Sequence, residues 1–102
     1  MDKYDAFGEN LKQKKLIIFY SAQIFESCVS YLTGSVLQSA LEILIDREVP
    51  IEAKVRMAIF IKHKVVYKDD MREVLFFTSI MEGGMHPIIL SILEKDFKKR
   101  LK

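Results

Sequence analysis

Residues 81–93 read MEGGMHPIILSIL and residues 32–44 read LTGSVLQSALEIL, and the relation between these two stretches decides the fold. Each stretch has the pattern of a helix that closes at glycine and is followed by a strongly apolar helix. When a motif is repeated in a chain, the surface between the stacked copies is a more common functional site than a single catalytic side chain. At an offset of 49 residues the identities are Gly34 with Gly83, Leu41 with Leu90, Ile43 with Ile92, and Leu44 with Leu93.

The match between the two halves is firm over residues 11–46 and 60–95 and weak at the N-terminus. Pro50 marks the division, because proline cannot continue a helix and is well suited to begin the next one. We therefore expect one all-α domain in which two degenerate copies of a three-helix motif, about 49 residues each, pack as a compact pseudo-twofold pair. The domain is 1–102, copy one is 1–49 and copy two is 50–102.

In copy two the apolar spacing predicts three helices. The first runs from Ile51, the second is capped by Asp69 or Asp70 and runs to Met81, and the third begins at Pro87. An aspartate at the helix start is the usual N-cap, and proline fits the first helical turn.

In copy one the second helix follows the stripe from Ala22 to Leu32 and closes at Gly34, and the third begins after Ser35. Residues 16–20 and 65–67 favour β-structure, so a short strand pairing between the copies is an alternative to a helix end with a buried connector.

The composition is that of a folded protein, with 50% hydrophobic and 29% charged residues. The single cysteine, Cys28, excludes an internal disulfide. No uninterrupted apolar run exceeds five residues, and the polar N-terminus does not resemble a signal peptide, so we expect a cytoplasmic protein without membrane attachment. The chain has one Asn, twelve Ile and twelve Lys, and this composition is typical of proteins from hot environments.

The net charge of +2 conceals an asymmetry between the halves. Residues 1–50 carry five basic and seven acidic side chains, and residues 51–102 carry eleven basic and seven acidic ones. Much of the basic excess lies in residues 95–102. Cations at a helix C-terminus suit the helix dipole, and a phosphate-contacting tail or an anionic protein partner are the alternatives.

Residues 81–93 contain the end of a helix, a glycine turn and an apolar helix that begins at proline. This pattern resembles the connection between the second and third helices of an armadillo or HEAT repeat. That resemblance implies an all-α fold that binds extended peptides in a groove. In length, composition and degenerate duplication the chain also resembles small proteins of the Acidianus filamentous viruses, which infect hyperthermophilic archaea. This second resemblance implies a viral accessory protein in the host cytoplasm.

The side chains that could act in catalysis or bind a metal do not have the spacing of a catalytic or metal site. His63 and His86 are the only histidines, and neither has further ligands at metal-binding spacing. We expect His63 to be solvated and His86 to make a local backbone hydrogen bond before Pro87. The sequence therefore predicts no catalytic residue, no metal and no cofactor, and the protein is not expected to be an enzyme.

The leading hypothesis is a protein–protein interaction module that binds a peptide or partner helix in a groove between the two copies. The alternative is a small basic DNA-binding regulator of helix-turn-helix type, although residues 36–46 offer no cation to read bases. Nucleic acid is thus the second choice of partner, and the protein is expected to be a monomer or a homodimer. The candidate groove residues are Lys15, Tyr20, Tyr31, Lys64, Tyr67, Phe76 and Phe77.

Overall fold

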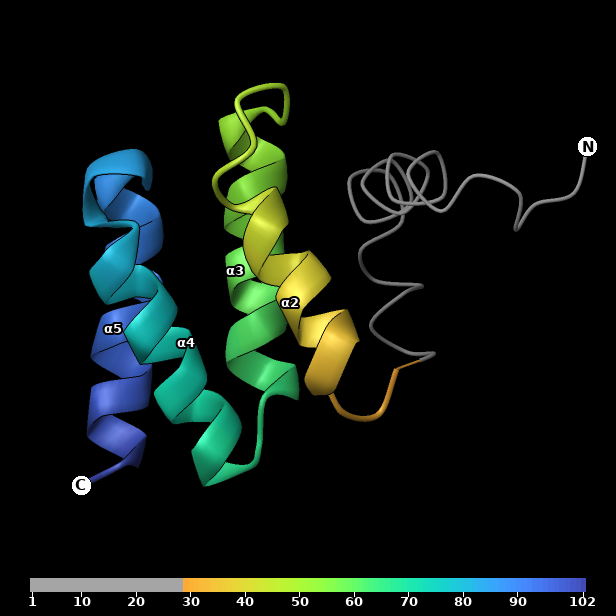
Figure 1. Ribbon diagram of the computed structural model, residues 1–102, viewed down its shortest axis with the longest axis vertical. Helices are drawn as coiled ribbons and strands as arrows, with labels where there is room; N and C mark the ends of the chain where they lie inside the picture. Colours follow the sequence, from red (N-terminus) through yellow and green to blue (C-terminus); the bar gives the residue numbers. More distant parts are fainter. Residues whose placement is uncertain (1–28) are drawn as a thin grey trace, which may run out of the picture.

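The computed structural model describes residues 29–102, and this part of the chain is helical throughout its regular structure (Figure 1). The helices are α2 (Gly34–Ile43), α3 (Ile51–Lys64), α4 (Lys68–Ile80) and α5 (Pro87–Arg100), with a 3-10 turn, η1 (Glu82–Gly84). Residues 29–102 contain no strand, so the all-α class is confirmed for them. The expectations for Lys15, Cys28 and the other residues of segment 1–28 lie outside the described residues.

The three helices expected in copy two are present at the expected places. α3 begins directly after Pro50, with Glu52 in its first turn, where the helix dipole favours an anion. α5 has Pro87 in its first turn. The predicted cap of α4 is wrong, because Tyr67 is the N-cap residue and Asp69 and Asp70 lie inside the first turn.

The four helices run alternately up and down and lie in two layers (Figure 1). α3 packs on α2 and α5, and α4 packs on the same two helices, which closes the contacts into a ring. At one end of this bundle, the lower end in Figure 1, α2 and α4 begin and α3 and α5 end. The fold therefore brings two helix N-termini and two helix C-termini to one surface.

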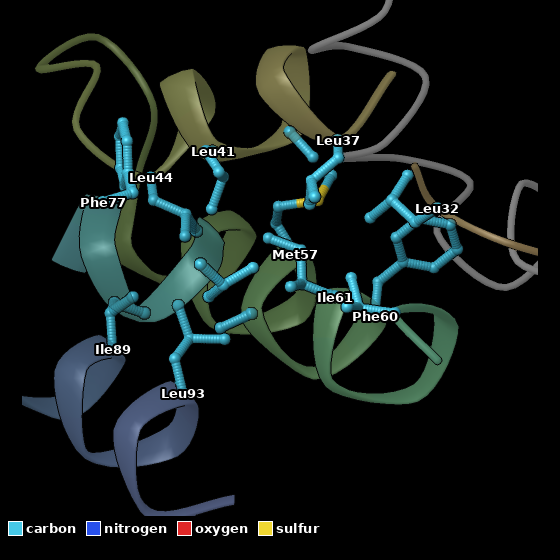
Figure 2. Close-up of a cluster of buried hydrophobic side chains, with 14 of the residues drawn as sticks. Leu32, Leu37, Leu41, Leu44, Met57, Phe60, Ile61, Phe77, Ile89 and Leu93 are labelled. Atoms are coloured by element: carbon cyan, nitrogen blue, oxygen red, sulfur yellow. The ribbon is translucent and has the colours of Figure 1, made fainter. Parts of the chain in front are cut away.

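The core is formed by the faces that the four helices turn toward one another (Figure 2). On α2 the buried Leu37 and Leu41 are four residues apart, and on α3 the buried Met57 and Ile61 repeat that spacing. Residues spaced in this way lie on one side of a helix, and each fully buried aliphatic side chain contributes about 1.5–3 kcal/mol. Leu32, which precedes α2, is also buried and adds the incoming chain to this core.

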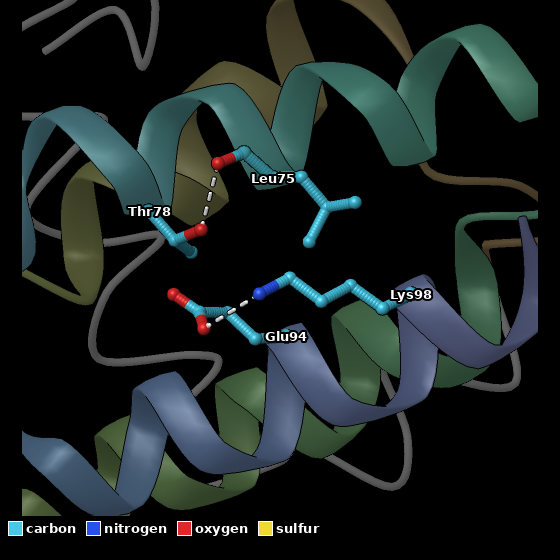
Figure 3. Close-up of polar contacts among 4 residues, drawn as sticks. All are labelled: Leu75, Thr78, Glu94 and Lys98. Atoms are coloured by element: carbon cyan, nitrogen blue, oxygen red, sulfur yellow. Dashed lines mark hydrogen bonds and ion pairs between the residues drawn. The ribbon is translucent and has the colours of Figure 1, made fainter.

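One polar side chain is fully buried among the described residues, and it lies on α4 in the layer facing α5 (Figure 3). The Thr78 hydroxyl donates to the carbonyl oxygen of Leu75 at 2.8 Å, which satisfies it within its own helix. Opposite, on α5, the Lys98 ammonium lies 3.4 Å from the Glu94 carboxylate, an exposed pair of small energetic value. The α4–α5 contact therefore depends on apolar packing.

Equivalent positions of the expected copies agree in part. Ala40 and Ile89 are both buried, and so are Leu44 and Leu93. The aligned glycines differ, since Gly34 has a φ of +58° at the first residue of α2 whereas Gly83 lies in η1 without a positive φ. The pseudo-twofold arrangement stays a prediction.

Two local expectations for the connectors are wrong. Residues 29–32 are not helical, so the second helix of copy one does not continue to Leu32. Residues 65–67 form no strand, because a chain that turns within three residues from α3 into α4 has no room for a ladder. Instead, the backbone N–H of Leu32 donates to the carbonyl oxygen of Lys64 at 2.9 Å.

Candidate functional site

The structure brings two of the predicted tyrosines into contact at the lower end of the bundle. The ring centroids of Tyr31 and Tyr67 are 5.6 Å apart and the ring planes are inclined by 52°. This is within the range of favourable aromatic pairs. Both side chains remain open to solvent, with 54% of Tyr31 and 51% of Tyr67 exposed. Two paired aromatic rings are thus displayed at the point where the chain enters the described fold.

The backbone on both sides of the pair is held in place by buried neighbours. Leu32 follows Tyr31 and Val65 follows Lys64, and both apolar side chains are buried in the core. The hydrogen bond from Leu32 N–H to the Lys64 carbonyl joins the two segments directly. We call residues 31–33 together with residues 64–67 the tyrosine junction.

A second polar link fixes the other edge of the tyrosine junction. The Thr33 hydroxyl donates to a carboxylate oxygen of Asp70 at 2.9 Å, which joins the start of α2 to the first turn of α4. Asp69 instead pairs with Arg72 of its own helix at 2.9 Å. Asp70 therefore tethers residues 31–33 rather than capping α4.

Basic side chains gather in the last turns of α3 and α5, at the same end of the bundle as the tyrosine junction (Figure 1). The last turn of α3 contains Lys62, His63 and Lys64, and the last turn of α5 contains Lys98, Lys99 and Arg100. The Arg100 guanidinium donates to the carbonyl oxygen of Lys62 at 3.0 Å and lies over the Phe97 ring at 5.6 Å from its centroid. This hydrogen bond joins two basic helix ends that are far apart in sequence.

The remaining predicted groove residues do not all join this surface. Phe77 is 9% exposed and belongs to the core, so its ring is not offered to a partner. Phe76, one residue earlier on the same helix, is 67% exposed. Ile80 is one turn further along the same outward side of α4 and is 59% exposed. Lys15 and Tyr20 lie outside the described residues.

The histidines take simple local positions. The Nδ1 atom of His86 accepts from the backbone N–H of Ile88 at 3.1 Å, so this side chain caps α5, as the sequence predicts. His63 is exposed in the last turn of α3. Within residues 29–102 no group of three His, Cys, Asp or Glu side chains is placed to hold a metal ion. None of the described helices is long and apolar enough to cross a membrane.

Two polar links of this surface have no clear signal in the sequence. Thr33 and Asp70 are 37 residues apart, and Arg100 and Lys62 are 38 residues apart. The local sequence pattern predicts that Asp70 caps a helix and that Arg100 lies in a solvated last turn. The pattern contains no information on which helix ends meet, so it cannot predict these two links. The 49-residue offset gives no signal for Thr33 and Asp70 either, since it aligns residues 31–33 with residues 80–82 and not with the start of α4.

Comparison of the chain with protein-family models, with curated proteins and with solved structures found no match.

Proposed function

We propose that this protein is a non-catalytic interaction module that binds a peptide or partner helix at the tyrosine junction. In this proposal the chain consists of two degenerate copies of one motif, and the partner lies where the copies meet. The observation that carries the proposal is the exposed Tyr31–Tyr67 pair, held on a backbone that is anchored to the core on both sides.

Tyrosine pairs of this kind suit protein recognition for two physical reasons. Each ring offers a large apolar area and a polar hydroxyl, and tyrosine is enriched among the residues that dominate binding energy at protein interfaces. The rings of Tyr31 and Tyr67 already rest against each other, so little side-chain freedom remains to be lost when a partner binds. Preorganisation therefore favours binding at this surface over binding at the isolated Phe76.

The DNA-binding alternative is less well supported by the positions of the cations. α2, the helix after the Gly34 turn, contains no Lys or Arg, and Glu42 is exposed on it. On α5 the cations all lie in the C-terminal half, from Lys95 to Arg100, where they can reach phosphate but present no helix to a groove. Reading of bases needs donors and acceptors along the helix that enters the groove.

A peptide-display selection tests the proposal. The full chain is immobilised, peptides are selected from a random library, and the affinities of the enriched peptides are measured by fluorescence anisotropy. We expect the double variant Tyr31→Ala/Tyr67→Ala to bind them about 30-fold more weakly, the equivalent of ~2 kcal/mol for an interface hot spot. Phe76→Ala is the matched control, since it removes an exposed aromatic ring outside the junction.

The control variant should retain wild-type affinity. Failure to enrich any peptide would overturn the proposal, and so would peptides that bind the double tyrosine variant as tightly as the wild type. Far-ultraviolet circular dichroism of each variant ensures that a lost affinity reflects a lost contact and not lost folding.

A further inference from the structure

We propose that the polypeptide bound at the tyrosine junction is acidic, with carboxylates that meet the basic last turns of α3 and α5. This inference rests on the proposed function and specifies its partner. Three observations carry it: the convergence of two basic helix ends, the absence of carboxylate partners for most of their lysines among the described residues, and the opposite charge at the other end of the bundle.

The two basic turns form one surface because their helices end side by side. α3 and α5 are packed against each other, and both end at the lower end of the bundle (Figure 1). The hydrogen bond from Arg100 to the Lys62 carbonyl, 3.0 Å long, fixes the last turn of α5 on that of α3. The carbonyl of Lys64 accepts from the backbone N–H of Leu32, so the basic last turn of α3 reaches the backbone of the tyrosine junction.

Most of these cations are not neutralised by the fold. Arg100 lies 3.5 Å from Asp96, and Lys98 pairs with Glu94. Within residues 29–102 no carboxylate pairs with the five remaining lysines of the lower end. These are Lys62, Lys64, Lys68, Lys99 and Lys102.

The helix dipole accounts for only part of this arrangement. Cations in the last turns of α3 and α5 are favoured by the dipole, but Lys68 is the first residue of α4, where the dipole favours an anion. A lysine at that position raises the positive potential of the lower end at some cost to the helix.

The opposite end of the bundle carries the opposite charge. Four exposed glutamates lie there. They are Glu42 on the last turn of α2, Glu48 in the following loop, Glu52 in the first turn of α3 and Glu82 in η1. A molecule with positive and negative ends orients an acidic partner during encounter and raises its association rate at low salt. An acidic segment is thus guided to the lower end and repelled from the upper one.

Polypeptide fits this surface better than nucleic acid does. The contact between the Tyr31 and Tyr67 rings, with centroids 5.6 Å apart, leaves no room for a base between them. Asp69, whose side chain is 95% exposed, and Asp70 follow directly after Tyr67 and Lys68. A nucleic acid would bring phosphates against these carboxylates, whereas a peptide can carry its acidic residues only on the side of α3 and α5.

A matched pair of charge-reversal variants tests the inference. Lys62→Glu/Lys99→Glu changes one lysine on α3 and one on α5 at the lower end, and Arg47→Glu/Lys54→Glu makes the same charge change at the upper end, in the loop before α3 and in the first turn of α3. The probes are the display-selected peptides, a glutamate-rich peptide that contains the same apolar anchors, and single-stranded oligothymidylate. Affinities are measured from about 0.05 to about 0.5 M salt, a range over which exposed charges become screened.

We expect the wild-type chain to enrich acidic peptides, whose affinity falls about tenfold in Lys62→Glu/Lys99→Glu and much less in Arg47→Glu/Lys54→Glu. Their affinity should also fall with rising salt, a test that needs no variant. Enriched peptides that need the tyrosines but show neither acidic bias nor salt dependence would overturn this inference and leave the proposed function standing. Tight binding of oligothymidylate, lost on charge reversal and with no peptide enriched, would overturn both.

Discussion

Replacement of Gly34 by alanine should destabilise the protein through the backbone alone. Gly34 has a φ of +58°, and no positive φ occurs at any other glycine among residues 29–102. A Cβ atom built at this position meets no heavy atom within 4 Å. In most glycine substitutions the conformational cost of a left-handed backbone and the cost of steric overlap occur together. In Gly34→Ala only the conformational cost is present.

The expected loss follows from two opposing contributions. A non-glycine residue in the left-handed region costs roughly 1–2 kcal/mol. Alanine also restricts the unfolded chain, whatever the native conformation, and this returns about 0.4–1 kcal/mol. We expect Gly34→Ala to lower the free energy of unfolding by about 1 kcal/mol, which corresponds to a fall in Tm of about 5 °C for a domain of this size.

Gly83→Ala is the matched control because Gly83 also has open space around its Cβ position but no positive φ. It should leave stability unchanged or raise it by up to about 1 kcal/mol. Urea unfolding followed by circular dichroism measures both variants on one scale. A Gly34→Ala variant as stable as the wild type, or a loss equal to that of Gly83→Ala, would refute the backbone argument.

Three further substitutions test individual contacts by the same unfolding assay. His86→Ala should cost about 0.5–1 kcal/mol and His86→Asn should restore it, because either imidazole or amide can accept from Ile88 N–H at the start of α5. Leu93→Ala should cost about 3 kcal/mol, since Leu93 is fully buried; a loss under ~1 kcal/mol would contradict its place in the core. Arg100→Ala should cost about 1 kcal/mol through its hydrogen bond to the Lys62 carbonyl, and Lys99→Ala, which makes no such bond, less than ~0.5 kcal/mol.

The helices of residues 50–102 were predictable because several local signals agree there. Pro50 and Pro87 mark two helix starts, and the apolar residues between them follow helical spacing. Where only one signal was present the prediction was weaker. The apolar stripe through Leu32 suggested a helix, but residues 29–32 form none, and Leu32 belongs to the buried core cluster without a helix of its own.

The candidate site was predictable only in outline. The sequence offers Tyr31 and Tyr67 among the candidate groove residues but not their contact, because the 49-residue offset aligns Tyr31 with Ile80 and Tyr67 with Ile18. Phe76 and Phe77 could not be separated by composition, since adjacent residues on a helix point in different directions and tertiary packing decides which one is buried. The tether between Thr33 and Asp70 needs knowledge of which helix ends meet, and this information is absent from local pattern.

The central claim is that the tyrosine junction is the recognition surface. A titration tests it most directly: a display-selected peptide is added to the isotope-labelled full chain, and the amide chemical shifts are followed. We predict that the largest shifts occur at residues 31–33 and 64–68, with smaller ones in the last turn of α5. Shifts concentrated instead on the outward side of α4, around Phe76 and Ile80, with the tyrosine junction unchanged, would contradict the claim.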